Sequence, residues 1–232
     1  MRVVPAVPPP LDEAELLARA EALAGERLDK VATRFGVRVP PDLSRHKGWT
    51  GNLLERALGA SAGSRAAPDF ETLGVELKTL PVDAAGRPTE STFVCTIPLR
   101  EIGEIEWEDS RVRRKLARVL WIPVQGERAR PLAERRIGSP LLWSPSADEL
   151  AALRFDWEEL AGLIGRGGLD LVTGHLGRFL QVRPKARDSS ARGRGSDADG
   201  AVFGALPRGF YLRAAFTEAL LRRAFGLAGR GG

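Results

Sequence analysis

The spacing of apolar residues changes along this 232-residue chain, and the change requires a fold that holds both helices and strands. Helical spacing governs the first 60 residues, whereas a period of two governs Val75 to Pro98. Two strands are expected here, "GVELKTL" and "TFVCTIPL", and the turn "DAAGRP" between them predicts a hairpin. The early part predicts three helices, at 11–25, 28–35 and 50–60.

Later segments alternate between the two kinds of pattern. "LARVLWIPV" and "GRFLQVRPKA" are typical of strands, and "GSPLLWSP" is an irregular apolar stretch. A long helix is expected from Ser146, where Glu149 completes a capping box. "GFYLRAAFTEALLRRAFG" predicts a strand followed by a last helix, and the low-complexity segment 187–201 predicts a mobile loop. Together these elements predict an α/β (α+β) fold, with a central mixed and mostly antiparallel sheet flanked by helices.

Composition narrows the class of protein. A hydrophobic content of 43% and a charged content of 28% are ordinary for a globular chain. Cys95 sits in an apolar run and is expected in the core, and two distant histidines, His46 and His175, exclude an ordinary zinc site. Because no signal peptide or membrane span is visible, we expect a cytoplasmic protein that does not engage a membrane.

The charge distribution points to a polyanionic partner. The net charge is +5, and basic residues cluster in the later part of the chain, as in "SRVRRKLAR", "VRPKAR" and "LRRAFG". Such clusters favour nucleic acid over membrane. Genomic base composition could explain the preference for arginine over lysine, but it does not explain the clustering.

The stretch "PDFETLGVELKT" carries the chemistry. Alternation along a strand puts Glu76 and Lys78 on one face and Val75 and Leu77 on the other, so the apolar face can pack inward while the charged face opens to a cleft. Asp69 and Glu76 supply the hard oxygen ligands that Mg²⁺ prefers, and Lys78 could deprotonate a water or balance phosphate charge. This set suits metal-assisted phosphodiester hydrolysis. The alternative is that Asp69 caps a turn and that Glu76 and Lys78 lie on a solvated strand face.

Two neighbouring features favour the catalytic interpretation. Glu55 lies on the helix before this stretch, and packing of that helix on the sheet could bring its carboxylate to the same cleft as Asp69 and Glu76. The intervening "LGASAGS" is small and glycine-rich, which permits close approach to a phosphate. Glu55 could instead pair with the adjacent Arg56 on the helix surface.

Longer motifs add a family resemblance. "KGWTGNLLERALGASAGSRAAPDFETLGVELKTLPVD", followed by "GRPTESTFVC", resembles the MutH family of DNA mismatch repair endonucleases, and the resemblance runs from about Leu11 to the last helix. It implies a restriction-endonuclease-like fold with two lobes around a DNA-binding cleft. The implied activity is Mg²⁺-dependent nicking of the unmethylated strand at hemimethylated GATC sites, coupled to mismatch detection by MutL and, indirectly, MutS.

The resemblance also implies roles for individual residues. Asp69 and Glu76 would be metal ligands, Lys78 the catalytic amine and Glu55 an accessory acid of the metal site. Lys115, in "VRRKL", would contact a backbone phosphate near the active site. The DNA-contacting residues would be Lys47, Phe93, Arg183, Pro184, Lys185 and Tyr211.

Physical chemistry allows these DNA contacts, since an arginine or lysine can bind guanine and an aromatic ring can sense a methyl group on adenine. The alternatives are that Tyr211, the only tyrosine, belongs to the core and that Arg183 and Lys185 merely touch phosphate.

The chain is expected to form a monomer with a flexible tail over 1–10, a single two-lobed domain over 11–226 and a frayed tail over 227–232. Two other functions stay open. One is a restriction enzyme that cuts both strands at GATC, and the other is a DNA-binding module without activity. A module of the second kind would gain nothing from carboxylates that face phosphates.

Overall fold

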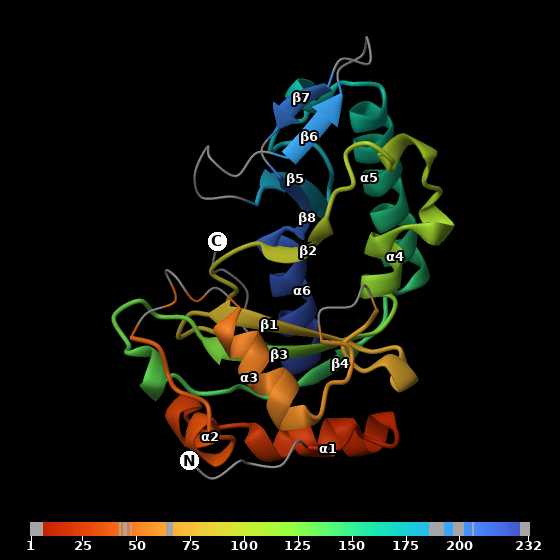
Figure 1. Ribbon diagram of the computed structural model, residues 1–232. Helices are drawn as coiled ribbons and strands as arrows, with labels where there is room; N and C mark the ends of the chain where they lie inside the picture. Colours follow the sequence, from red (N-terminus) through yellow and green to blue (C-terminus); the bar gives the residue numbers. More distant parts are fainter. Residues whose placement is uncertain are drawn as a thin grey trace. The chain divides into compact units, whose positions relative to one another are not determined.

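The computed structural model describes residues 7–41, 43, 46, 48–63, 67–185, 193–196, 202–205 and 207–227, and the chain divides into two compact units (Figure 1). The first unit comprises residues 1–90, 117–144 and 218–232. The second comprises residues 91–116 and 145–217. Helix α6 (Ala214–Phe225) begins in the second unit and ends in the first.

The first unit contains a three-stranded sheet in the order β1-β3-β4. Strand β1 (Glu76–Val82) runs parallel to β3 (Val119–Gln125), which pairs in antiparallel fashion with β4 (Leu141–Trp143). Six consecutive residues of β3, 119–124, are buried, as is typical of a central strand that is covered on both faces.

Three helices cover one face of this sheet, and all three agree with the sequence-based prediction. They are α1 (Glu13–Leu23), α2 (Leu28–Arg34) and α3 (Trp49–Leu58). Asp12 caps α1 by accepting a hydrogen bond from the Glu15 N–H at 2.8 Å. The apolar sides of the helices and Leu77, Leu120 and Ile122 of the sheet form one buried core.

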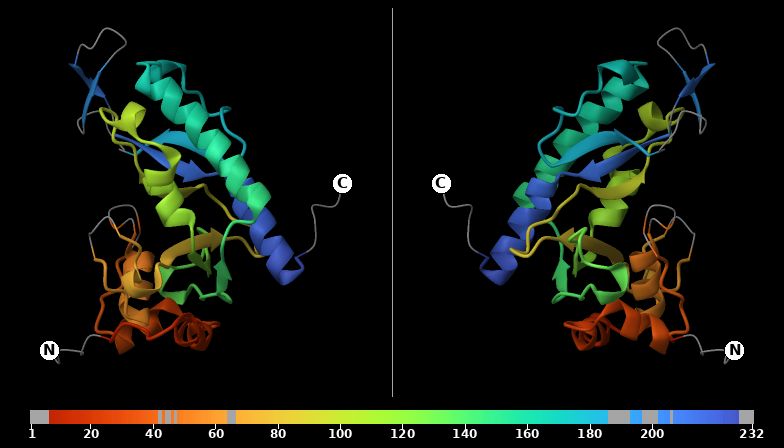
Figure 2. Two further views of the ribbon diagram at one scale, coloured as in Figure 1. Left: turned by 90° about the vertical axis from the view of Figure 1, so that its right-hand side faces the viewer. Right: turned by 90° about the vertical axis from the view of Figure 1, so that its left-hand side faces the viewer.

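The other face of the sheet carries Glu76 and Lys78 of β1 and Trp121 of β3, because parallel partners in register point to the same side. Figure 2 shows the last turns of α6 on this side of the sheet and α3 on the other. Leu220 and Leu221 of α6 are buried. The first unit is therefore a sheet between helical layers, and the two charged residues lie inside it.

The predicted hairpin is wrong. The turn closes locally, since Asp83 N–H donates to the Arg87 carbonyl at 2.9 Å, but β2 (Thr92–Thr96) then pairs with β8 (Arg208–Leu212) in the second unit. Period-two spacing indicates a strand but does not indicate its partner.

The second unit contains an antiparallel sheet in the order β2-β8-β5, with β5 at Leu180–Pro184. Strands β6 (Gly193–Ser196) and β7 (Val202–Ala205) form a separate pair. The prediction of a loop over 187–201 is therefore wrong for 193–196, and the rest of that segment lies outside the described residues.

Helix α5 (Ala147–Gly165) packs on β5 and has the predicted capping box, in which Ser146 and Glu149 exchange hydrogen bonds (Figure 2). The buried Asp156 on this helix accepts hydrogen bonds from the N–H groups of Arg178, Phe179 and Leu180 at 2.6–2.8 Å. One carboxylate thus fixes the backbone at the start of β5.

The mixed α/β fold expected from the sequence is confirmed, with its strands divided between two three-stranded sheets and the β6–β7 pair. Strands β3, β5 and β8 and helices α5 and α6 were predicted, whereas β4 and the short α4 (Arg111–Leu116) were not. Cys95 is buried, as expected. Short 3₁₀ helices lie at Glu71–Leu73, Ile102–Glu104, Trp107–Asp109, Leu132–Glu134 and Leu169–Leu171.

The two expected tails lie mainly at 1–6 and 228–232, which are outside the described residues. Within the described part of the N-terminal segment, Pro10 is buried. In the described ranges, no helix is long and apolar enough to cross a membrane.

Candidate active site

The acidic residues Asp69 and Glu76 meet at one peptide of β1. The Asp69 Oδ2 accepts a hydrogen bond from the Leu77 N–H at 2.8 Å, and Leu77 directly follows Glu76. An antiparallel bridge between Phe70 and Val75 closes the segment that joins the two acids. Asp69 therefore binds the backbone of the strand that carries Glu76.

Lys78 lies on the same side of β1 as Glu76. Its Nζ is 2.6 Å from the Glu76 Oε1, and both side chains are largely buried, with exposed fractions of 14% and 3%. The structure thus differs from the expected open, charged strand face, because Glu76 is enclosed. A buried carboxylate needs a cation or hydrogen-bond donors close to it, and Lys78 supplies both.

Trp121 is the neighbour of Lys78 on β3, and sequence analysis did not single it out. The indole is fully buried, and its ring centroid lies 6.0 Å from that of Trp143. Within the described residues, its Nε1 is a buried polar atom without a hydrogen-bond partner. A large apolar residue thus occupies the position next to Lys78 on this face of the sheet.

Glu55 is half-buried in the last turn of α3. Its carbonyl accepts hydrogen bonds from Gly59 and Ala60, while Ser61 and Ala62 donate to the carbonyl of Asp69. The small segment 59–62 therefore connects the backbone of Glu55 to that of Asp69. Glycine is needed at 59, where φ is 85°.

These carboxylates form a suitable donor set for Mg²⁺, which commonly takes one or two protein carboxylates and completes its shell with water and substrate phosphate. In the described residues, no three His, Cys, Asp or Glu side chains lie together as a complete metal site. Asp69, which accepts from the Leu77 N–H, and Glu76, the residue before Leu77, supply two carboxylates of the number that suits an ion sharing its ligands with a nucleic acid.

The second unit gathers five of the predicted DNA-contacting residues at one sheet. Phe93 of β2 pairs in register with Tyr211 of β8, and their rings meet edge to face with centroids 5.3 Å apart. The Lys185 Nζ lies 4.9 Å from the centroid of the Phe93 ring. Arg183, Pro184 and Lys185 are exposed at the end of β5.

Two hydroxyl groups that sequence analysis missed hold the cations of this sheet. Ser91 Oγ accepts from the Arg183 Nη1 at 2.7 Å, and Thr96 Oγ1 accepts from the Lys185 Nζ at 2.8 Å. Their proximity arises from the pairing of β2 and β5 with β8, which no local pattern reveals. Two exposed cations and two aromatic rings on one surface can bind phosphate and stack on bases.

Two predicted residues remain, Lys115 and Lys47. Lys115 is half-buried on α4 of the second unit. Lys47 lies outside the described residues, next to Gly48, the residue that precedes α3.

A mixed α/β chain in which β1 carries Glu76 and Lys78 and Asp69 bonds to the backbone of that strand fits the restriction-endonuclease-like class. The chain belongs to the MutH family of DNA mismatch repair enzymes. The family profile, "DNA mismatch repair enzyme MutH", matches residues 58–156.

Relatives match nearly the whole chain. A "DNA mismatch repair protein MutH" from Klebsiella pneumoniae subsp. pneumoniae is 54% identical over 223 residues, which are 96% of this chain and 96% of that protein. The protein of the same name from Salmonella paratyphi C is 54% identical over 221 residues, or 95% of this chain and 96% of the relative.

Proposed function

We propose that this chain is the methyl-directed nicking endonuclease of mismatch repair. It would cut the unmethylated strand at hemimethylated GATC sites by Mg²⁺-dependent hydrolysis and would act as a monomer in the cytoplasm. The observation that carries the proposal is the joining of Asp69 and Glu76 at the Leu77 peptide, with Lys78 2.6 Å from Glu76.

Asp69 and Glu76 would hold the Mg²⁺ ion, and Glu55 would serve as the accessory acid. When bound, the ion would supply Lewis acidity at the scissile phosphate and lower the pKa of an attacking water. Lys78 would accept a proton from that water as a neutral amine, or would balance the negative charge that develops on the phosphate as an ammonium. Lys115 would contact a backbone phosphate.

The sheet of the second unit supports a role in sequence reading. Arg183 and Lys185 can donate to guanine O6 and N7, a contact worth about 1–3 kcal/mol of discrimination. Tyr211 and Phe93 supply rings that could sense the methyl group on adenine, with Pro184 beside them and Lys47 as a further phosphate contact. MutL would activate the enzyme, and MutS would act indirectly through it.

A plasmid nicking assay with Mg²⁺ tests this proposal, with unmethylated, hemimethylated and fully methylated GATC substrates, each with and without MutL. We expect nicks only in unmethylated strands, stimulation by MutL and no nicking by Glu76→Ala, which should still bind DNA. Double-strand cutting without a partner would identify a restriction enzyme instead. Binding without any cutting would leave a DNA-binding module.

A further inference from the structure

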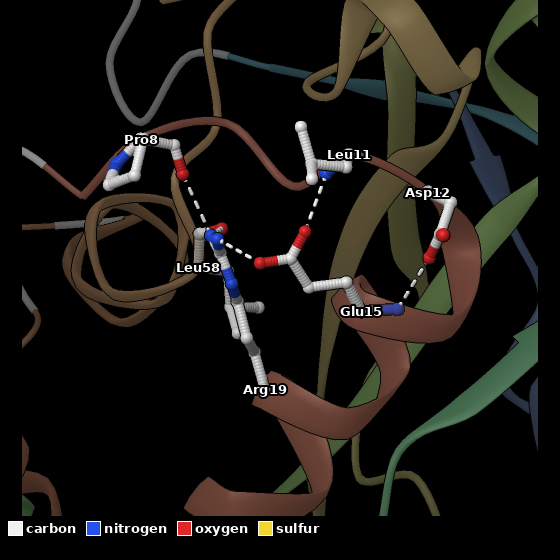
Figure 3. Close-up of polar contacts among 6 residues, drawn as sticks. All are labelled: Pro8, Leu11, Asp12, Glu15, Arg19 and Leu58. Atoms are coloured by element: carbon white, nitrogen blue, oxygen red, sulfur yellow. Dashed lines mark hydrogen bonds and ion pairs between the residues drawn. The ribbon is translucent and has the colours of Figure 1, made fainter.

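Arg19 of α1 joins three parts of the first unit (Figure 3). Its Nη1 donates to the Pro8 carbonyl at 2.7 Å and to the Leu58 carbonyl at 3.1 Å. Its Nη2 donates to the Glu15 Oε1 at 2.6 Å, and the other carboxylate oxygen of Glu15 accepts from the Leu11 N–H at 2.7 Å. The guanidinium group is thereby fixed in direction, with its positive charge on the last carbonyl of α3.

The end of α3 leaves almost no free space around this contact. A Cβ at Gly59 would lie 2.4 Å from the Pro8 carbonyl oxygen and 3.1 Å from the Arg19 Nη1. Gly59 also has a φ of 85°, which other residues rarely adopt. Arg19, Pro8 and Gly59 therefore determine where the helix ends, and a cation at this end also favours the helix dipole.

A chain of hydrogen bonds leads from that point to the acidic residues. The Gly59 and Ala60 N–H groups donate to the Glu55 carbonyl at 3.0 and 2.9 Å. The next two residues, Ser61 and Ala62, donate to the Asp69 carbonyl at 2.9 and 3.2 Å. The Asp69 carboxylate then holds the Leu77 N–H, between Glu76 and Lys78.

We propose that Arg19 is a positioning residue for the metal site, which acts by fixing the end of α3 and hence the spacing between Glu55 and Asp69. This inference rests on the proposed function. In the described contacts, the Arg19 side chain touches none of Glu55, Asp69 and Glu76, so its effect would pass through the backbone of 58–62. Leu16 and Ala20 keep α1 in the core by apolar contacts, so the loss of Arg19 should loosen the end of α3 without releasing the helix.

The test is the dependence of thermal unfolding on Mg²⁺ concentration, because an ion that binds the folded state at a free concentration c stabilises it by RT ln(1 + c/Kd) and so raises Tm. KCl at matched ionic strength is the salt control, and Glu76→Ala defines the response without the site. We expect Arg19→Gln to raise the Mg²⁺ Kd about three- to tenfold, less than the roughly 10–100-fold typical of residues that hydrogen-bond a metal ligand directly. Arg19→Lys, which keeps a cation at the Leu58 carbonyl, should recover part of the loss.

The matched control is Arg154→Gln, which removes an arginine bonded to Glu158 and Glu108 on the second unit. It should leave the Mg²⁺ Kd unchanged. In the nicking assay, Arg19→Gln should need correspondingly more Mg²⁺ for half-maximal rate, with the KM for DNA at saturating Mg²⁺ within about twofold of wild type.

A lower Tm with an unchanged Mg²⁺ Kd would overturn the inference, because Arg19 would then serve folding alone. If Arg19→Gln does not fold, Arg19→Lys carries the same comparison. Two other results would overturn the proposed function itself: nicking that persists in Glu76→Ala, or a wild-type Tm that does not change with Mg²⁺. Either result would also overturn the inference about Arg19.

Discussion

The Lys78 ammonium lies 2.6 Å from the Glu76 carboxylate, and both groups are largely enclosed by the protein. An ion pair in such a place does not need to contribute net stability, but the loss of one partner leaves a charge that is poorly solvated. The pair can therefore be examined by stability as well as by activity.

Lys78→Met should abolish nicking and lower the free energy of unfolding by about 2–4 kcal/mol, because Glu76 loses its buried cation. Urea denaturation in EDTA measures the stability. The double variant Glu76→Gln/Lys78→Met should recover much of the loss while staying inactive. Strictly additive effects of the two changes would contradict a coupled pair.

Asp69 is expected to combine a structural and a chemical role, which two variants separate. Asp69→Asn keeps an oxygen for the Leu77 N–H and should cost less than about 1 kcal/mol, whereas Asp69→Ala should cost about 1–3 kcal/mol. Both should lose nicking, because neither offers a carboxylate to Mg²⁺. Near-normal nicking by Asp69→Asn would remove Asp69 from the metal ligands.

Asp156 should matter for stability alone. Asp156→Ala leaves three N–H groups at the start of β5, one buried and two partly buried, without their acceptor, so the free energy of unfolding should fall by about 3 kcal/mol. Asp170→Ala, at an exposed position of the same unit, is the control and should stay within about 0.5 kcal/mol of wild type. Equal stability of the two variants in urea would contradict this role.

Gly209 should be essential for the position of Phe93. A Cβ at Gly209 would lie 2.7 Å from the Phe93 Cε2 and 3.0 Å from the Cys95 carbonyl oxygen. Gly209→Ala should therefore displace the ring and weaken binding to GATC DNA about tenfold or more, given that a stacked base contributes about 1–3 kcal/mol. Fluorescence anisotropy measures the affinity. Gly174→Ala, where a Cβ would meet nothing within 4 Å, is the matched control and should bind normally.

Glu13 should make a small contribution to acid stability. Its hydrogen bond from Arg118, supported by the charge of that residue, holds the pKa of Glu13 below its ordinary value of about 4.5. A depressed pKa in the folded state gives stability that is present above pH 4.5 and is lost as the pH falls through the lowered pKa. Both groups are about one-third exposed or more, so the loss should stay near 0.5 kcal/mol. Glu13→Gln should flatten this part of the pH–stability curve, and an unchanged curve would assign the effect to other carboxyl groups.

The sequence by itself determined the elements whose signals are local. The helices at α1, α3 and α5 follow from apolar spacing, and the Ser146–Glu149 capping box follows from two side chains three residues apart. The long motif around Asp69, Glu76 and Lys78 determined the family, because its residues are contiguous in the chain.

Only the tertiary structure decided which strands are neighbours. Period-two spacing is the same whether β1 pairs with β2 or β3, and the choice of β3 depends on contacts between residues more than 40 positions apart. For the same reason, the sequence could not predict that Ser91 bonds to Arg183 or that Arg19 bonds to the end of α3. Local physical chemistry specifies whether each segment forms a helix or a strand, whereas the burial of its faces specifies which other segments it packs against.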